Sequence, residues 1–422
     1  MKKLHVILLM FAFAVSLHAQ DAVTTLAGQA LVSGAANGTG TNAAFSDPAA
    51  IVVDMNGNFY VADSQNDAIR KVTTNGVVTT FAGQLGVPGS ANGTGTGAQF
   101  SAPSGLAFDQ SGNLFVSDTG NSMIREITPA EVVSTFAGIA GASGFADGAA
   151  GSAQFSSPLG IAVAPNGAVY VADSGNHCIR VISGGIVSTF AGSPGIWGSA
   201  DGFGTAAQFN GPVGLVFDSL TNLFVSDANN DTIRKIAPNG TVTTFAGAAG
   251  ADGSTDGTLT SARFRSPAEL AFDKRGNLFV ADSLNQVIRK ISTNGIVSTV
   301  SGAARIYGAN DGVNGAGRFY NPYGLAIGAD GGLRMTDTYN ELVRTVLVPF
   351  TLSLQMSGAA QMAVISWDAI IGKTYQVQFK NDLTAAWTDL DSSVTATNLS
   401  LSATDNATGG SQQRVYRVTV TP

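Results

Sequence analysis

The chain has 422 residues, which is long enough for one large domain and a smaller one. It carries 22 Lys and Arg residues against 29 Asp and Glu residues, a net charge of −7. Loss of Lys2 and Lys3 with the first twenty residues would leave 20 basic against 29 acidic residues, a net charge of −9. Such an acidic chain lacks the basic face that phosphates require, so nucleic acid is excluded as an expected partner.

The first twenty residues predict an export signal. Two lysines are followed by an apolar run over 6–17 and by the small residue Ala19, which is the order of a signal peptide. No later segment is a continuous apolar run of about 18 residues, so we expect no membrane span in the mature chain. The mature protein is therefore predicted to be exported, whether to the periplasm, the cell surface or the medium, and to be a monomer.

Cysteine and histidine are too scarce for several kinds of site. Cys178 is the only cysteine, so no intrachain disulfide can form. His5 and His18 lie in the predicted signal, which leaves His177 as the only histidine of the mature chain. A zinc site built from two or three histidines is therefore excluded.

The motif D-x-x-N-x-x-[I/V]-R occurs six times. Its aspartates lie 54 or 55 residues apart, at Asp63, Asp118, Asp173, Asp227, Asp282 and Asp337. A second motif, F-x-x-P, recurs upstream of each copy with the same spacing. Each unit contains four short runs rich in Val, Ile, Phe and Thr, separated by Gly, Asn, Asp and Pro, which predicts four strands. Four strands and a 55-residue period are typical of the blades of a β-propeller.

The two ends of the repeated region predict how the ring closes. VTTLAG at 23–28 matches the fourth strand VTTFAG at 78–83, yet it precedes the first full unit. The last unit has no fourth strand of its own. We therefore predict an all-β fold, a six-bladed β-propeller over 21–349 in which the N-terminal strand completes the sixth blade.

With its D-x-x-N-x-x-[I/V]-R turn after a G-N-[L/F]-[Y/F]-V strand, the repeat resembles the NHL repeat, whose Asn-His-Leu position is occupied here by residues 176–178. The longer unit is similar to NHL propellers of bacterial exported proteins and of some thioredoxin-linked proteins, although this chain has no C-x-x-C. Related propellers include sugar-lactone hydrolases with a divalent metal in the channel and amidating lyases with a His-bound zinc. The histidines of the latter are missing here.

The repeated polar residues favour a structural interpretation. We expect the motif Asp to accept N–H bonds from the residues just after it, the Asn to adopt a positive φ, and the Arg to pair with a carboxylate or loop carbonyls. The residue after the Asn is expected to be merely polar and exposed. A further element, G-x-x-[D/N]-G, predicts tight turns, and the alternative is calcium binding by the loop carboxylates.

Departures from the repeat are the candidate site residues. Glu269 replaces an Ala or Gly at the start of an inner strand, so its carboxylate is a candidate channel group, with a solvated or Arg-paired side chain as the alternative. Trp197 and Tyr307 share one loop position, and Tyr320 and Tyr323 flank a proline at the start of the sixth unit. Exposed aromatic side chains on loops stack on sugars or anchor peptides, and buried ones pack between loops.

After residue 349 the repeat ends. Residues 350–422 alternate as strands and contain Trp367, Tyr375, Trp387 and Tyr416, which predicts a small β-sandwich with the tryptophans in its core. The pattern resembles fibronectin type III-like modules of exported bacterial proteins.

Two functions stay open from the sequence. The first is a non-catalytic exported scaffold that binds a protein, peptide or glycan through the loop-rich face of the propeller, with no cofactor. The second is a metal-dependent hydrolase or lyase of a small molecule, with Glu269 as ligand or base at the channel mouth. Other carboxylates beside Glu269 would favour the enzyme, and an aromatic patch near Trp197 or Tyr307 would favour binding.

Overall fold

A computed structural model describes residues 8–9, 16–18, 22–313, 315–328, 330–347, 351–357, 362–369, 374–381, 385–398, 400–405 and 415–421. One compact unit holds residues 22–328 and 333–346, and a second holds the remaining described residues. The predicted signal peptide falls almost wholly outside the described residues, apart from β1 (Leu8–Leu9) and β2 (Ser16–His18). In the part of the chain that the structure describes, no helix is long and apolar enough to cross a membrane.

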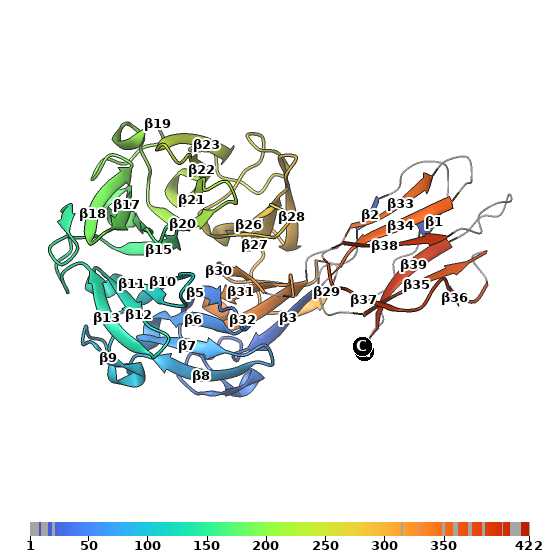
Figure 1. Cartoon of the computed structure of the whole chain (residues 1–422), viewed down its shortest axis with the longest axis horizontal. Coiled ribbons are helices and arrows are strands. Elements are labelled where there is room, and N and C mark those ends of the chain that lie inside the picture. The colour runs from blue at the N-terminus through green and yellow to red at the C-terminus, as the bar shows by residue number, and fades with distance from the viewer. Residues whose placement is uncertain are drawn as a thin grey trace. The chain divides into compact units, whose positions relative to one another are not determined.

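The first unit consists of six antiparallel sheets that follow one another along the chain (Figure 1). In blades 1 to 3, the strands in chain order are β4 (Gly38–Thr39), β5 (Pro48–Val53), β6 (Phe59–Asp63), β7 (Ala68–Val72) and β8 (Val77–Ala82); β9 (Gly93–Thr94), β10 (Pro103–Phe108), β11 (Leu114–Asp118), β12 (Met123–Ile127) and β13 (Val132–Ala137); and β14 (Gly148–Ala149), β15 (Pro158–Val163), β16 (Val169–Asp173), β17 (Cys178–Ser183) and β18 (Ile186–Ala191).

Blades 4 to 6 repeat this order. Their strands are β19 (Gly202–Phe203), β20 (Pro212–Phe217), β21 (Leu223–Asp227), β22 (Thr232–Ile236) and β23 (Thr241–Gly247); β24 (Gly257–Thr258), β25 (Pro267–Phe272), β26 (Leu278–Asp282), β27 (Val287–Ile291) and β28 (Ile296–Gly302); and β29 (Gly312–Val313), β30 (Pro322–Ile327), β31 (Leu333–Asp337), β32 (Leu342–Leu347) and β3 (Ala22–Ala27). Each inner strand contacts the inner strand of the next blade, and β30 contacts β5, so the six blades form a closed ring.

The N-terminal strand closes the ring as predicted. In blade 6 the strand order is β29-β3-β32-β31-β30, so β3 takes the place of the fourth strand that the last repeat lacks. Figure 1 shows β3 beside β32 and β29, although their residues lie far apart in the sequence. The predicted all-β, six-bladed architecture is therefore confirmed.

Each blade has five strands rather than the four that the sequence predicts. The extra strand is a two-residue segment of the Gly-rich linker, and it pairs with the beginning of the fourth strand, as Gly148–Ala149 does with Val187 and Ile186. The linker side chain just before it explains this position: Asp147 Oδ2 accepts hydrogen bonds from the Thr189 N–H and hydroxyl. Much of each linker thus lies along the outer strand instead of forming a free loop.

Apolar side chains fill the spaces between blades. The phenylalanine of every F-x-x-P motif is fully buried, at Phe45, Phe100, Phe155, Phe209, Phe264 and Phe319. Complete burial of one such side chain stabilises the fold by about 1.5–3 kcal/mol. Because the same residue recurs in each unit, each linker is fixed to its blade in the same way.

A short 3-10 turn joins β6 to β7 in blade 1 and the equivalent two strands in every other blade. These turns cover Ser64–Asn66, Thr119–Asn121, Ser174–Asn176, Ala228–Asn230, Ser283–Asn285 and Thr338–Asn340. Three further 3-10 turns lie in the linkers, at Gly40–Asn42, Gly95–Gly97 and Gly204–Ala206. Each turn of the first kind begins directly after the motif Asp and ends at the motif Asn.

The second unit contains two sheets that pack face to face. One includes β33 (Thr351–Ser357), β34 (Met362–Asp368) and β38 (Ser400–Asp405) with β2; the other includes β35 (Thr374–Lys380), β36 (Thr388–Asp389), β37 (Val394–Thr395) and β39 (Val415–Thr421) with β1.

Trp367, Tyr375 and Tyr416 form the core between these two sheets, which confirms the predicted sandwich. The expectation that both tryptophans are core residues is wrong for Trp387. Its ring is only partly buried, and the Lys380 Nζ lies 4.9 Å from its centroid.

Candidate functional site

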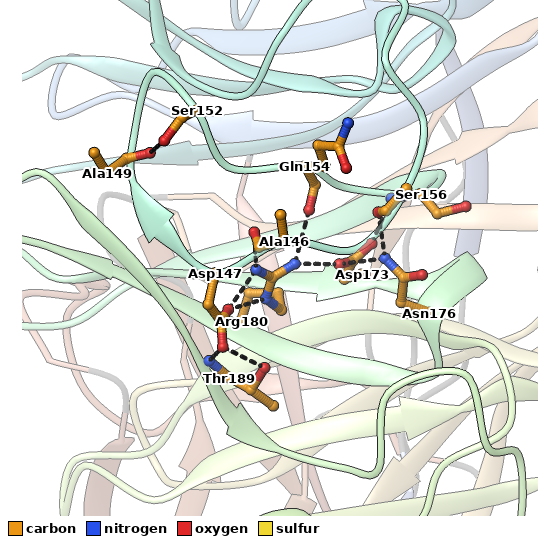
Figure 2. A network of polar contacts seen from close by, with 11 residues as sticks. Ala146, Asp147, Ala149, Ser152, Gln154, Ser156, Asp173, Asn176, Arg180 and Thr189 are labelled. Atoms are coloured by element: carbon orange, nitrogen blue, oxygen red, sulfur yellow. Dashed lines mark hydrogen bonds and ion pairs between the residues drawn. The ribbon is translucent and has the colours of Figure 1, made fainter.

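The repeated motif forms a buried polar network in each blade, shown for blade 3 in Figure 2. Asp173 Oδ1 accepts from the backbone N–H of Ser156 at 2.7 Å. Its Oδ2 accepts from Asn176 Nδ2 at 2.8 Å and from Arg180 Nη1 at 2.7 Å. Burial raises the pKa of the Asp173 carboxyl, and the three donors partly offset this by favouring the charged form. The expected bonds to N–H groups just after the Asp are therefore wrong, since its backbone partner lies 17 residues upstream.

Arg180 connects this network to the linker before its own blade. It donates to the carbonyl oxygens of Gln154 at 2.9 Å and Ala146 at 2.8 Å, pairs with Asp147, and its guanidinium lies 5.1 Å from the centre of the Phe155 ring. The other five arginines lie over their phenylalanines at 5.1–5.7 Å. The motif is thus a structural cross-link, which confirms the role expected for its arginine.

The same contacts explain the [D/N] of the Gly-rich element. These side chains accept from the motif arginines at 2.5–2.8 Å in every blade, at Asn37, Asn92, Asp147, Asp201, Asp256 and Asp311. These side chains bind a guanidinium group. In the calcium alternative, the same oxygens would have to bind a metal ion instead. Among the described residues, no group of three or more His, Cys, Asp or Glu is arranged to hold a metal ion.

In five of the six blades the residue after the motif Asn links neighbouring blades, and the expectation that it is merely a polar surface residue is wrong. His177 Nδ1 accepts from the N–H of Gly211 in the next linker at 3.1 Å, and Glu341 Oε2 accepts from Asp47 at 2.7 Å across the closure of the ring. These residues, rather than the Asn, adopt the positive φ, which is 55° for His177. Burial lowers the pKa of His177, which favours the neutral ring that an Nδ1 acceptor requires.

Cys178 is fully buried in β17, and this burial raises the pKa of its thiol. Because the thiolate is the reactive form, we expect no reaction with 5,5′-dithiobis(2-nitrobenzoate) under native conditions. One equivalent of thiol should react once the protein is unfolded in guanidinium chloride. Rapid release of the chromophore from folded protein would contradict this structural role.

Glu269 and Tyr323 lie on the neighbouring inner strands β25 and β30, which line the central axis of the ring. Solvent reaches part of the Glu269 side chain, but protein surrounds it closely, and this burial raises its pKa to about 8. Burial and the nearby Glu269 carboxylate both raise the pKa of the Tyr323 hydroxyl.

Four of the other blades have glycine where blade 5 has Glu269. A Cβ at these positions would collide with a carbonyl oxygen of the next inner strand, as at Gly105 against Leu159 and Gly324 against Ala49. Blade 5 therefore differs from the other blades in placing a large and acidic side chain at this boundary, where blade 1 has only the methyl group of Ala50. The other five inner strands contain no Asp or Glu, so none of them supplies a second carboxylate.

Tyr307 and Tyr320 are brought together on the loop-rich face of blade 6. Their rings stack at 4.9 Å with an interplanar angle of 30°. Tyr339 adds an edge-on contact to Tyr320 at 5.1 Å. Tyr307 is 68% exposed and Tyr339 is 48% exposed, so the tyrosine cluster (Tyr307, Tyr320 and Tyr339) presents aromatic surface to solvent.

The sequence prediction missed Tyr339. It lies inside the repeated turn, in DTYN, where the other blades have Gln65, Gly120, Gly175, Asn229 and Leu284. A comparison of this variable position across the repeats could have found it. At the three corresponding positions every other blade has at most one aromatic residue, and blade 1 has Ser33 and Ser46, whose hydroxyls lie 2.7 Å apart.

The backbone beneath the cluster is held firmly. Asn340 Nδ2 donates to the carbonyl oxygen of Gly308 at 2.6 Å, and the N–H of Tyr339 donates to the carbonyl oxygen of Tyr320 at 3.1 Å. Arg305 ties the Tyr307 loop to Asp252 of the preceding linker at 3.2 Å. The tyrosines are thus presented on an ordered surface.

Trp197 occupies the blade 4 position that corresponds to Tyr307. It is 68% exposed, and its two companion positions are Asn210 and Asn229, so it stands without an aromatic cluster of its own. The sequence candidates therefore divide into three places: the tyrosine cluster, the isolated Trp197, and the axial pair Glu269 and Tyr323.

The fold and its buried Asp–Asn–Arg cross-links define a six-bladed β-propeller. Residues 155–182 match the family model described as "NHL repeat", and this match covers the blade 3 turn, Arg180 and the strands around them. Blade 3 therefore carries an NHL repeat, and the chain is similar to NHL-repeat proteins in its six-bladed fold.

Relatives of known sequence agree with this assignment. The chain is 30% identical over 280 residues to "Protein SUPPRESSOR OF QUENCHING 1, chloroplastic" of Arabidopsis thaliana, covering 61% of this chain and 26% of that protein. It is 28% identical over 294 residues to human "NHL repeat-containing protein 2", covering 61% of this chain and 40% of that protein. The chain thus spans less than half the length of these two relatives.

A solved structure shares the fold. The "auxiliary nutrient binding protein" of Bacteroides thetaiotaomicron superposes with a TM-score of 0.59 at 14% sequence identity, over 78% of this chain and 77% of that one. At this identity the likeness concerns the architecture.

Proposed function

We propose that this protein is a non-catalytic binding scaffold whose principal contact surface is the tyrosine cluster on the loop-rich face of blade 6. The observation that carries the proposal is the break in symmetry. All three positions are tyrosine in blade 6, whereas every other blade has at most one aromatic residue there, and two of these tyrosines are strongly exposed. A ligand of this surface would be a glycan, a peptide or a protein segment.

Tyrosine suits such a surface because its ring supplies apolar area while its hydroxyl forms hydrogen bonds, and both are presented at low entropic cost. Loops on a rigid scaffold are common places for binding. A structural neighbour that is described as nutrient-binding is compatible with this role. We further propose that residues 1–20 are an export signal, that the propeller ends near 349, and that 350–422 is a separate module.

The alternative function, a metal-dependent hydrolase or lyase, rests on Glu269. Its raised pKa suits an acid or base, but metal sites of this kind need several ligands, and the described inner strands bring no further carboxylate to it. The test is to measure the melting temperature of the protein, first with EDTA and then with a series of divalent metal ions. A rise with calcium or zinc that Glu269→Gln abolishes would favour the enzyme over the scaffold.

Tyr307→Ala and Tyr339→Ala are expected to weaken ligand binding by about tenfold or more each, because exposed aromatic anchors dominate such contacts. Affinity electrophoresis against soluble polysaccharides and a peptide array would identify the ligand. The control is Leu220→Ala. It changes an equally exposed residue, which lies in the 218–222 hairpin at the opposite end of blade 4. If a ligand binds both tyrosine variants with wild-type affinity, the tyrosine cluster is not the site.

A further inference from the structure

A pocket of about 260 Å³ lies between blades 3 and 4, at the end of the propeller opposite the tyrosine cluster. Its floor consists of the buried Leu223 and Ile236, and its walls are three aromatic rings. The rings of Tyr170 and Phe190 meet edge to face at 5.0 Å, and Tyr170 meets Phe217 at 5.2 Å. Exposed residues form the rim, namely Pro165, Asn166, Thr221 and Pro238.

The repeats explain why this crevice is open. In blade 1 the same hairpin holds Asp54 and Asn58, and Asp54 Oδ2 accepts from Asn58 Nδ2 at 3.0 Å and from the Tyr60 hydroxyl at 3.3 Å. Blades 2, 4 and 5 retain the Asp–Asn pair, at Asp109 and Asn113, Asp218 and Asn222, and Asp273 and Asn277. Blade 3 has Ala164 and Ala168 instead, so two polar side chains are replaced by methyl groups.

The aromatic rings nevertheless keep their arrangement. Tyr60 contacts Phe81 and Phe108 edge to face at 4.8 and 5.2 Å, as Tyr170 does with Phe190 and Phe217. Tyr170 therefore retains the hydroxyl that Tyr60 uses as a donor, but the acceptor carboxylate is missing. Within the described residues, no hydrogen-bond partner replaces it, and burial raises the pKa of Tyr170, so this hydroxyl remains a protonated donor.

We propose that this pocket binds a small, uncharged, single-ring ligand whose oxygen accepts the hydrogen bond of the Tyr170 hydroxyl, in the place that the Asp54 carboxylate takes in blade 1. The volume of the pocket limits the size of the ligand, because a cavity of about 150 Å³ holds benzene and sites for drug-sized ligands begin at about 300 Å³. The aromatic walls and the two prolines favour a flat, apolar ring. The acidic chain disfavours an anionic ligand.

The test is a ligand-observed NMR titration of the full chain with benzamide, and with toluene as a ring that lacks the acceptor oxygen. Benzamide should bind saturably to one site. Tyr170→Phe should lower the affinity for benzamide by about fivefold, which is the effect of one hydrogen bond, and should leave the affinity for toluene unchanged. Equal affinities of benzamide for the wild type and Tyr170→Phe would overturn the role of the hydroxyl.

Restoring the repeat provides the decisive control. The double change Ala164→Asp with Ala168→Asn recreates the blade 1 residues, so it should fold, fill the pocket and abolish benzamide binding. The reverse change in blade 1, Asp54→Ala with Asn58→Ala, should create a second site of the same kind. No saturable benzamide binding to the wild type, or undiminished binding to the restored variant with an unchanged melting temperature, would overturn the proposal. Tyr307→Ala should leave benzamide binding unchanged, which separates this site from the tyrosine cluster.

Discussion

Replacing Arg234 with methionine is expected to lower the free energy of unfolding by about 3–5 kcal/mol. Arg234 and Asp227 are both fully buried and form an ion pair at 2.9 Å. Removing the guanidinium leaves the carboxylate buried with only the Asn210 N–H and Asn230 as donors. It also frees the carbonyl oxygens of Gln208 and Ala200 from their donor, so several desolvated groups lose partners at once. Guanidinium denaturation of the variant and the wild type measures the loss.

The matched control is Asp201→Asn, which changes the half-exposed second partner of the same arginine. Asparagine stands at this position in blades 1 and 2 and accepts the same bond, so a cost of less than about 1 kcal/mol is expected. If Arg234→Met and Asp201→Asn lower the free energy of unfolding by similar amounts, the buried ion pair contributes no more to stability than the half-exposed one.

Glu269 should make the propeller less stable as the pH rises from about 5 to 8. Its pKa in the folded protein is raised to about 8, whereas an unfolded glutamate titrates near its ordinary value of 4.5. Between these values the folded state keeps a proton that the unfolded state has lost, so the free energy of unfolding falls with a slope approaching about 1.4 kcal/mol per pH unit. The contribution is fully present below pH 4.5 and is lost as the pH approaches 8.

Glu269→Gln should remove this part of the pH dependence and stabilise the protein at pH 8 by about 2–4 kcal/mol, since glutamine carries no charge to desolvate. Denaturation curves at pH 5, 6.5 and 8 for both proteins isolate the effect, because the buried aspartates titrate identically in the two. A wild-type stability that parallels that of the variant across this range would mean that Glu269 is ionised in the folded state.

The sequence alone was sufficient for the architecture because each blade repeats it. Six copies of one motif at a constant spacing predict six blades, and the unpaired VTTLAG segment predicts the closure that β3 makes with β32. These inferences need only local strand patterns and the requirement that sheet edges be covered. The sequence left open whether Trp197 and Tyr307 are exposed or packed between loops, and the structure shows that both are exposed.

Local sequence patterns could not predict the contacts between segments that lie far apart in the chain. Asp173 was expected to bond residues that follow it, but its backbone partner is Ser156, because the linker folds back over the turn. For the same reason the fifth strand was missed, since the linker lies along the outer strand, where Asp147 bonds Thr189 and Arg180 and Gly148–Ala149 pairs with β18. The pocket at Ala164 became visible only through the space left between two blades.

The position of β3 has a consequence for the order of folding. Thr25 bonds Asp311 across 286 residues, so the first propeller strand to be made pairs with one of the last propeller segments to appear. Contacts this remote in sequence carry the largest loop-closure entropy and form late, whereas each blade assembles from neighbouring strands. During synthesis, β3 therefore stays unpaired until blade 6 is available to receive it. Chaperones or proteases that recognise exposed strands would encounter this segment before any other part of the propeller.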